Sequence, residues 1–493
     1  MTAGRDGGVR PHRRQFVLGP EPVAPNADWI AEPFGDGLVL SRCPELRAAR
    51  GRDAEGEAWV LLGLAVATAD DAPDPVEALR RVRTRDVPEL TWDWCGRWLL
   101  LGRELALTDA SALLGLLWRR DRRGRLWLSS SPALVARAGG EPAAVADPRR
   151  LAHGRGVAWF PPPATRFEGV SRLLPSQALD LRASRPRPRA LLPREESEAG
   201  IGTALDRLAA AVGATIRNLR RATGGPVWLG LTAGADSRAV LAAAVAAGAE
   251  IRPYTRLTPR MPVADRATPP FLAAAAGYPH RLVVDGPIPP DRRALLEAHA
   301  AGSVSEGDAL PFLSGVRDDL DGVLIGGNGL EVASGYYRGV GLPHEPPSPG
   351  AGAAAFLASQ NEPPASPAAA GVEAWLDWAR RHPAEGLDWR DRLFFEQRQA
   401  GWLAAKEQVY DMQPGLRAPI VNCARLRARI LALPERYRAA KNLQRDMVAR
   451  FAPELARWPV NPPDRAFLLS HPGAVLRRVS RRAAARLRRL PPR

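Results

Sequence analysis

The sequence of 493 residues contains no run of about 18 uncharged apolar residues, so it predicts no transmembrane segment. Cysteine is scarce: Cys43, Cys95 and Cys423 are far apart and form no CxxC pair. Their spacing argues against a disulfide framework and against a thiolate metal site. A reducing, cytoplasmic location is therefore expected.

Lysine is scarcer still, with Lys406 and Lys441 standing against 67 arginines. The net charge of +16 is thus almost entirely arginine, a skew typical of a GC-rich genome when alanine, proline and glycine are also abundant. This interpretation disfavours nucleic acid as a partner. Eight arginines lie between residues 477 and 493, so residues 466–493 are interpreted as a basic tail. A solvated terminal helix and a contact with an anionic surface are the two alternatives for that tail.

The order of apolar segments predicts two domains of different class. Residues 14–182 contain short apolar runs separated by turns, which predict a sheet-rich domain, and the proline-rich, charged residues 183–200 predict a linker. Residues 201–465 alternate helix and strand patterns, which predict a parallel sheet with helices on both faces. Residues 341–371 are rich in Pro, Ala and Gly and predict either a mobile lid or disorder, with helices near 388–410, 423–432 and 437–452.

The segment LTAGADSR, residues 231–238, joins a short apolar strand to an alanine-rich helix. Loop residues at a helix N-terminus meet unpartnered N–H groups and the helix dipole, both of which attract anions. Small side chains let a phosphate approach the backbone, and Asp236 beside a phosphate predicts a bridging Mg²⁺. The chain has no GK[ST] and no GxGxxG after a strand, which excludes the Walker and dinucleotide loops. The predicted ATP- and pyrophosphate-binding residues here are Thr232, Ala233, Gly234, Ala235, Asp236 and Ser237.

Two further segments complete the predicted site. IGGNGLEVASGYY, residues 325–337, follows another predicted strand, and its Gly327 and Gly329 are predicted to help bind the nucleotide. Glu331 is predicted to share Mg²⁺ with Asp236, because neighbouring strand ends meet at one edge of a parallel sheet. Lys441 is predicted to be catalytic, since its compact ammonium can sit on one phosphate or tetrahedral oxygen where arginine cannot.

These segments carry a resemblance to a known family. LTAGADSR resembles the SGGxDS loop of the N-type ATP pyrophosphatases, with Thr232 and Ala233 replacing the first serine and glycine. Residues 325–337 resemble the GDGGDELFGGY segment of asparagine synthetase, and Lys441 with the following Asn-Leu-Gln-Arg is similar to its KxxLR. Over roughly residues 14–465 the chain resembles the asparagine synthetase superfamily, in the manner of lasso-peptide cyclases and β-lactam synthetases.

The resemblance implies a fold and a reaction. The fold would be an Ntn-hydrolase-like α+β sandwich followed by a parallel-sheet α/β ATP pyrophosphatase domain with C-terminal helices. The front domain is similar to a glutamine amidotransferase domain, but Thr2 stands where that family has its cysteine, and Cys43 and Cys95 are internal. The implied enzyme is an ATP- and Mg²⁺-dependent ligase that forms an amide through an acyl-adenylate, with release of AMP and pyrophosphate and without glutamine-derived ammonia.

The substrate would be a carboxylate-bearing small molecule or peptide, including a peptide precursor. Departures from the family pattern leave two alternatives open. Residues 415–419 lack the acid of the family's ExRxP segment, and Asn328 replaces an aspartate, so a catalytically degenerate scaffold protein is the first. The second is a tRNA-modifying ATP pyrophosphatase that would use the basic tail.

Overall fold

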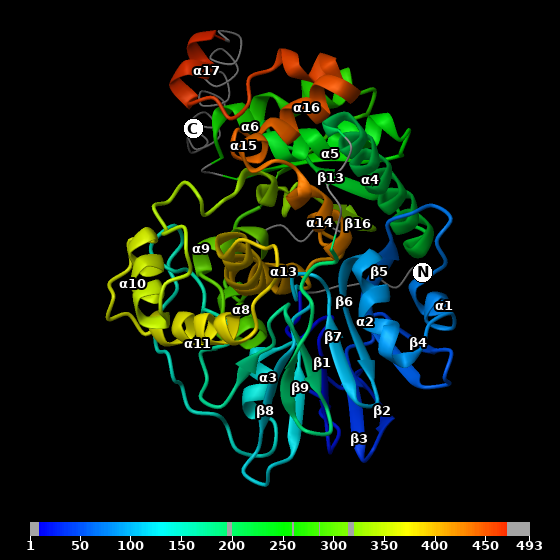
Figure 1. Ribbon diagram of the computed structural model, residues 1–493, viewed down its shortest axis with the longest axis vertical. Coiled ribbons are helices and arrows are strands. Elements are labelled where there is room, and N and C mark those ends of the chain that lie inside the picture. The colour runs from blue at the N-terminus through cyan, green and yellow to red at the C-terminus, as the bar shows by residue number, and fades with distance from the viewer. Residues whose placement is uncertain (1–8, 195–199, 259–260, 285, 314–319, 471–493) are drawn as a thin grey trace, which may run out of the picture.

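The computed structural model describes residues 9–194, 200–258, 261–284, 286–313 and 320–470. Thr2 and the tail from residue 471 onward lie outside the described residues. Figure 1 shows antiparallel strands gathered at one end of the molecule and helices around a second sheet at the other. Among the described helices, none combines the length and the apolarity needed to cross a membrane.

The N-terminal part is a sandwich of two six-stranded antiparallel sheets. In spatial order the first sheet contains β10 (Ser171–Arg172), β8 (Leu117–Arg120), β9 (Leu126–Ser129), β1 (Phe16–Gly19), β3 (Leu38–Arg42) and β2 (Ile30–Gly35). The second contains β12 (Arg185–Pro188), β11 (Gln177–Asp180), β7 (Leu105–Thr108), β6 (Trp94–Gly102), β5 (Ala58–Ala67) and β4 (Ala48–Arg52). Short helices flank them: α1 (Pro75–Leu79), α2 (Val87–Leu90) and α3 (Pro132–Arg137).

Apolar side chains from both sheets form the sandwich core. Phe16 of the first sheet lies in one cluster with Leu62 and Leu99 of the second. β6 is buried along its whole length, because its outer face is covered as well, by a cluster that includes Leu79 of α1 and Val87 of α2. A strand with two covered faces shows a continuous apolar run rather than alternation, as WCGRWLLLG does.

The interval predicted as a linker, residues 183–200, contains a strand. β12 pairs with β11 in antiparallel register from Arg185 to Pro188, so the second sheet extends into that interval. Its prolines are tolerated because β12 is the edge strand of the sheet, where one side of the backbone has no partner strand.

The C-terminal part contains a separate, parallel sheet of five strands in the order β15-β14-β13-β16-β17. The strands are β13 (Val227–Gly230), β14 (Arg252–Leu257), β15 (Arg281–Val284), β16 (Val323–Ile325) and β17 (Leu416–Arg417). The sequence did not predict β17, a strand of two residues. The helices between strands are α4 (Ile201–Thr223), α5 (Ala235–Ala246), α6 (Val263–Ala267), α7 (Pro269–Ala275), α8 (Arg292–Ala300) and α9 (Glu306–Leu313).

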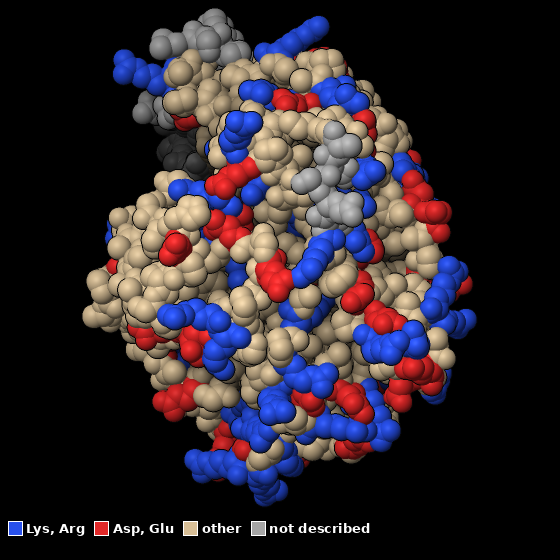
Figure 2. Space-filling model, viewed as in Figure 1, with Lys and Arg blue, Asp and Glu red and all other residues tan. Residues whose placement is uncertain are grey.

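Residues 341–371, predicted as either a mobile lid or disordered, contain one helix and the start of a second, joined by turns and loops. α10 (Pro349–Ser359) and α11 (Ala368–Arg381) pack against each other, and Phe356 and Trp375 are fully buried in the central core. Alanine is the best helix former, and Pro349 occupies a first-turn position where proline is tolerated. Figure 2 shows a largely uncharged surface over α10, whereas basic and acidic side chains alternate over much of the remaining face.

The C-terminal helices are α12 (Trp389–Leu393), the π-helical η5 (Phe394–Leu403), α13 (Ala404–Tyr410), α14 (Ala424–Ala432), α15 (Glu435–Ala439), α16 (Asn442–Phe451), η6 (Pro453–Arg457) and α17 (Asp464–Ser470). Of these helices, α16 packs against α5, and α14 and α15 pack against η4 (Leu330–Ser334), the helix that follows β16. Phe467 of α17 is buried against Ala233 and Ala264, so the packed body continues past residue 465.

Candidate functional site

The candidate site lies where the strand order of the parallel sheet reverses. From β13 the chain proceeds to β14 and β15 on one side, whereas β16 and β17 lie on the other. Ligands of such sheets bind at this switch point, beyond the carboxyl ends of the strands. The loop after β13 leads into α5, which begins at Ala235, and the loop after β16 leads into the 3₁₀ helix η4 (Leu330–Ser334). Both predicted phosphate segments therefore follow paired parallel strands and lie at the same edge of the sheet.

Two hydroxyl groups organise the loop after β13. The Oγ atoms of Thr232 and Ser237 lie 3.1 Å apart, and the N–H of Thr232 donates to Ser237 Oγ at 3.2 Å. Gly234 N–H donates to Thr232 Oγ1 at 3.0 Å. The N–H groups of the first turn of α5 have no partner within the helix, so a preformed loop presents backbone donors to an anion.

Ala233 lies on the buried side of this loop. Its N–H donates to Asp265 Oδ1 at 2.8 Å, and its carbonyl accepts from the buried guanidinium of Arg238 at 3.0 Å. Arg238 also donates to the carbonyls of Leu455 and Trp458, which ties the loop to the C-terminal segment. The Ala233 N–H is thus bonded to a carboxylate, as the Gly234 N–H is to Thr232. The N–H groups that remain for a ligand are those of the first turn of α5.

The structure brings Asp236 and Glu331 together. Burial raises the pKa of Glu331, and the negative charge of Asp236 raises it further. Burial also raises the pKa of Asp236, while a hydrogen bond from Gln444 and the charge of Lys441 act in the opposite direction. Within the described part of the chain no cluster of three or more His, Cys, Asp or Glu side chains could hold a metal. Two carboxylates are nevertheless enough for Mg²⁺ when phosphate and water supply the other ligands.

Glycine is required at two positions of the second loop. A Cβ added to Gly327 would lie 2.7 Å from both the backbone and the Cβ of Asp236, so the two loops touch there. Gly329 has φ of +102°, a conformation that favours glycine, and its N–H donates to Glu331 Oε2 at 2.6 Å. This bond fixes the Glu331 carboxylate against its own loop.

Lys441 stands directly before α16 at φ +56°, in the left-handed region. Its side chain is exposed, and its positive charge partly offsets the rise in the pKa of Asp236 that burial causes. The third predicted segment therefore reaches the same site as the first two.

Gln444, on the first turn of α16, is a site residue that the sequence did not reveal. This buried amide donates to Asp236 Oδ1 at 2.9 Å and to the Leu330 carbonyl at 3.3 Å, so it bridges the two loops. Its Oε1 is buried without a hydrogen-bond partner. The only signal in the sequence is its position three residues after Lys441, one helical turn along.

A second group that the sequence did not reveal lies on η5 and α13. From residue 390 to 409 this helical segment is buried except at positions 398, 402 and 406, which share one side of it. The guanidinium of Arg398 lies 4.6 Å from the ring centre of Tyr336 and 4.5 Å from that of Trp402, and Lys406 Nζ lies 4.8 Å from Trp402. The positive charge of Arg398 partly offsets the rise in the pKa of Glu331. The cations on this side of the helical segment, Arg398 and Lys406, therefore begin near the paired carboxylates.

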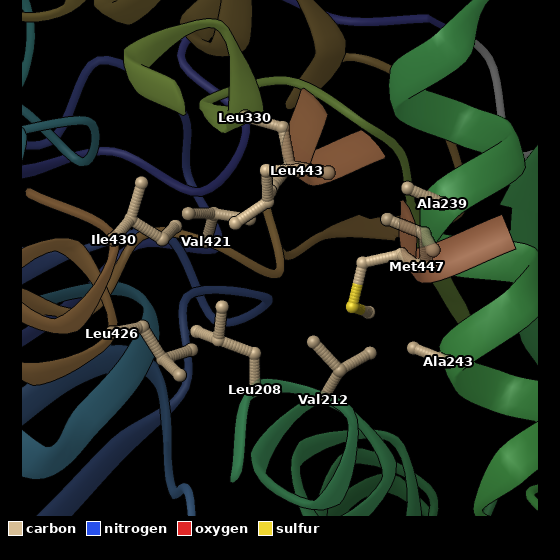
Figure 3. Close-up of a pocket in the computed structure, with 11 residues that line it drawn as sticks. Leu208, Val212, Ala239, Ala243, Leu330, Val421, Leu426, Ile430, Leu443 and Met447 are labelled. Carbon is tan, nitrogen blue, oxygen red and sulfur yellow. The ribbon is translucent and has the colours of Figure 1, made fainter. Parts of the chain in front are cut away.

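An apolar cavity borders the site behind its polar groups. It has a volume of ≈ 20 Å³ and lies between α4, α5, α14, α16 and η4 (Figure 3). Leu330 and Leu443, the neighbours of Glu331 and Gln444, point into it. Its size and its wholly apolar lining rule it out as the place for a triphosphate.

The sandwich supports the site through buried polar contacts. Asn422 donates to Asp109 Oδ1 at 2.7 Å and to the Gly96 carbonyl at 2.6 Å, and Ser111 Oγ donates to Gln399 at 2.8 Å. Cys43 and Cys95 are buried, and burial raises the pKa of the Cys95 thiol. A thiol in such surroundings is a poor nucleophile.

No model of a known protein family matches the chain, and no curated protein matches it. The fold and the arrangement of the site therefore carry the functional argument.

Proposed function

We propose that the protein is an ATP-dependent ligase of the asparagine synthetase kind, which activates a carboxylate as an acyl-adenylate and joins it to an amine. The observation that carries the proposal is a pair of half-buried carboxylates at the switch point of a parallel sheet: Asp236, in the first turn of α5, and Glu331, whose pKa the charge of Asp236 raises. Close anionic groups with raised pKa values call for a cation between them, and a helix N-terminus calls for an anion. Magnesium-bound triphosphate satisfies both demands.

Each residue then has a defined task. Asp236 and Glu331 would hold Mg²⁺, which supplies charge neutralisation on the phosphates. Thr232 and Ser237 would bind the pyrophosphate portion through their hydroxyl groups and the N–H groups of the first turn of α5, while Gly234, with no side chain, would let the phosphate approach the loop. A substrate carboxylate oxygen attacks the α-phosphorus and pyrophosphate leaves. The amine then attacks the acyl carbon, loses a proton and expels AMP, while Lys441 stabilises the negative charge that develops on the oxygens.

Arg398 supports the assignment of an acid as substrate. Rings of Tyr336 and Trp402 hold its guanidinium by stacking, and a stacked guanidinium keeps the N–H groups at its edge for a carboxylate. The charge of Arg398 also acts to lower the pKa of Glu331, which supports placing the substrate carboxylate near the predicted metal position.

Two measurements test the proposal. Radiolabelled pyrophosphate should exchange into ATP only when a suitable acid is present, and Mg²⁺-dependent ATP affinity should fall at least roughly tenfold in Asp236→Ala. Asp377→Ala, which removes an exposed carboxylate of α11 paired with Arg381, is the control. Equal ATP affinity in both variants would favour the scaffold alternative. The tRNA alternative stays a prediction, because the basic tail lies outside the described residues.

A further inference from the structure

Arg172, on the edge strand β10 of the sandwich, is a buried cation without a protein partner. Only 7% of its surface is exposed, and its guanidinium has no acceptor and no carboxylate partner among the residues that the structure describes. Arg189 is a suitable comparison, since burial lowers the pKa of both side chains to about 10. Arg189, however, donates to the Thr108 carbonyl at 2.8 Å and to Thr91 Oγ1 at 2.9 Å.

The Arg172 side chain lines a small cavity between the two halves of the molecule. The sandwich contributes Leu117 and Arg172, the turn between α8 and α9 contributes Ser303, and the helical segment behind the candidate site contributes Gly401 and Ala405. The remaining lining residues are Phe160, Ala164 and Thr165. Thr165 Oγ1 is already bonded to the Val170 carbonyl at 2.9 Å, so Ser303 is the hydroxyl available to complement the guanidinium.

A buried cation needs a compensating charge. At neutral pH the guanidinium stays protonated, because a pKa of about 10 is still well above 7. Removing an ion from water without a counter-ion is among the most destabilising changes a fold can contain. A water molecule could accept hydrogen bonds from Arg172 but would leave its charge uncompensated.

The cavity volume limits what can supply that charge. At ≈ 10 Å³ it has space for about one water-sized particle, which excludes phosphate, sulfate and organic acids. We propose that this cavity is a binding site for one small inorganic monoanion of the halide class, held between the guanidinium of Arg172 and the hydroxyl of Ser303. The site is separate from the candidate nucleotide site and does not depend on the function proposed for it.

The anion has a structural consequence. Its ligands come from β10 and from the turn after α8, so it joins the sandwich to the second half of the chain. It binds the folded chain only, because the unfolded chain does not bring Arg172 and Ser303 together. Chloride should therefore raise the stability of the native protein by mass action.

Thermal unfolding at constant ionic strength tests this. Replacing sodium gluconate by sodium chloride should raise the midpoint by roughly 2 °C in a saturable manner, and Arg172→Met should remove that dependence. Arg189→Met, the matched control, should unfold at a lower temperature yet keep the full response to chloride. Loss of the response in both variants, or a response that Arg172→Met retains, would overturn the proposal.

A second measurement locates the ion and does not depend on stability. Crystals of the full-length chain grown with sodium bromide should give an anomalous peak between Arg172 and Ser303. For Ser303→Ala, at least roughly tenfold more chloride than for the native protein should be needed to raise the thermal unfolding midpoint by the same amount. Water in place of a bromide peak would contradict the assignment, as would an adventitious ion only, seen elsewhere on the surface.

Discussion

At the scale of single residues, the carboxylate pair proposed to bind Mg²⁺ lowers the stability of the fold. A carboxyl group whose pKa is raised in the folded state destabilises the fold at any pH above that raised value, and the penalty shrinks as the pH falls through it. Both Asp236 and Glu331 are of this kind. Glu331→Gln removes one of two close charges and keeps the shape, so it should stabilise the protein by about 1 kcal/mol while weakening Mg²⁺ binding.

Denaturant unfolding and Mg²⁺ titration in the presence of ATP measure the two effects. Glu373→Gln, an exposed substitution on α11, should change neither. As the pH of the native protein is lowered, both carboxylates become protonated at pH values above 3.8 and 4.5, the ordinary pKa values of Asp236 and Glu331. Mg²⁺ affinity should therefore begin to fall before the pH reaches those values. A less stable Glu331→Gln with unchanged Mg²⁺ affinity would count against a paired site.

The adjacent residues Gly326 and Gly327 differ in how closely the loop after β13 approaches them. A methyl group on Gly327 would clash with Asp236 at 2.7 Å, whereas one on Gly326 would meet nothing within 4 Å. Gly327→Ala should destabilise the protein by about 1–3 kcal/mol and weaken ATP binding, because the two loops must separate. Gly326→Ala should leave both unchanged. Equal effects of the two substitutions, by thermal unfolding and ATP titration, would show that the loops do not touch as described.

At the scale of elements, the π-helical η5 carries Arg398, which we propose binds the substrate carboxylate. Nearly all of its side chains are buried, and π-helical turns occur frequently at functional sites. Arg398→Lys keeps the charge but loses the planar fork, so it should raise the KM for the acid in pyrophosphate exchange roughly tenfold, with a smaller change in kcat. Arg252→Lys, which alters a guanidinium stacked on Trp228, is the control. An equal rise in KM for both variants would remove Arg398 from the substrate site.

The elements also show what sequence reasoning can reach. Short apolar runs predicted a sheet-rich domain over residues 14–182 and a parallel sheet over residues 201–465, because buried strands are apolar, and both parts contain such strands, for example β6 and β13. The same reasoning missed β17, too short to leave a pattern, and α10, whose proline and glycine content resembles a loop. The position of residues 232–237 between a strand and a helix was predictable because it depends on local sequence alone. Gln444 and Arg398 were not, since each meets the site only through packing of distant segments.

At the scale of the whole molecule, the sandwich and the second half share buried charges. Arg97 of β6 forms a bidentate ion pair with Asp411 at 2.8 and 3.0 Å, and both side chains are almost fully buried. Breaking a buried pair on one side leaves an uncompensated charge, which typically destabilises by about 3–5 kcal/mol. The front half therefore behaves as an integral support for the strand ends that carry the candidate site.

A buried histidine at the same boundary makes the fold sensitive to acid. His299 Nδ1 accepts from the His12 N–H at 2.9 Å, and its Nε2 donates to the Gln408 carbonyl at 2.7 Å, an arrangement that needs the neutral ring. Burial lowers the pKa of His299 from 6.5 to about 3. Between these values the unfolded chain binds a proton that the folded chain excludes, so stability falls as the pH falls from 6.5 toward 3, by about 1.4 kcal/mol per pH unit.

Replacement of His299 isolates this contribution from that of the carboxylates. His299→Gln preserves a donor and an acceptor, so it should be somewhat less stable at pH 8 but lose less free energy of unfolding than the native protein between pH 6.5 and 4. His344→Gln, at an exposed position, should keep the native slope. Urea unfolding at half-unit steps of pH provides both curves. Parallel curves for His299→Gln and the native chain would mean that the ring is already charged in the folded state, contrary to its hydrogen bonds.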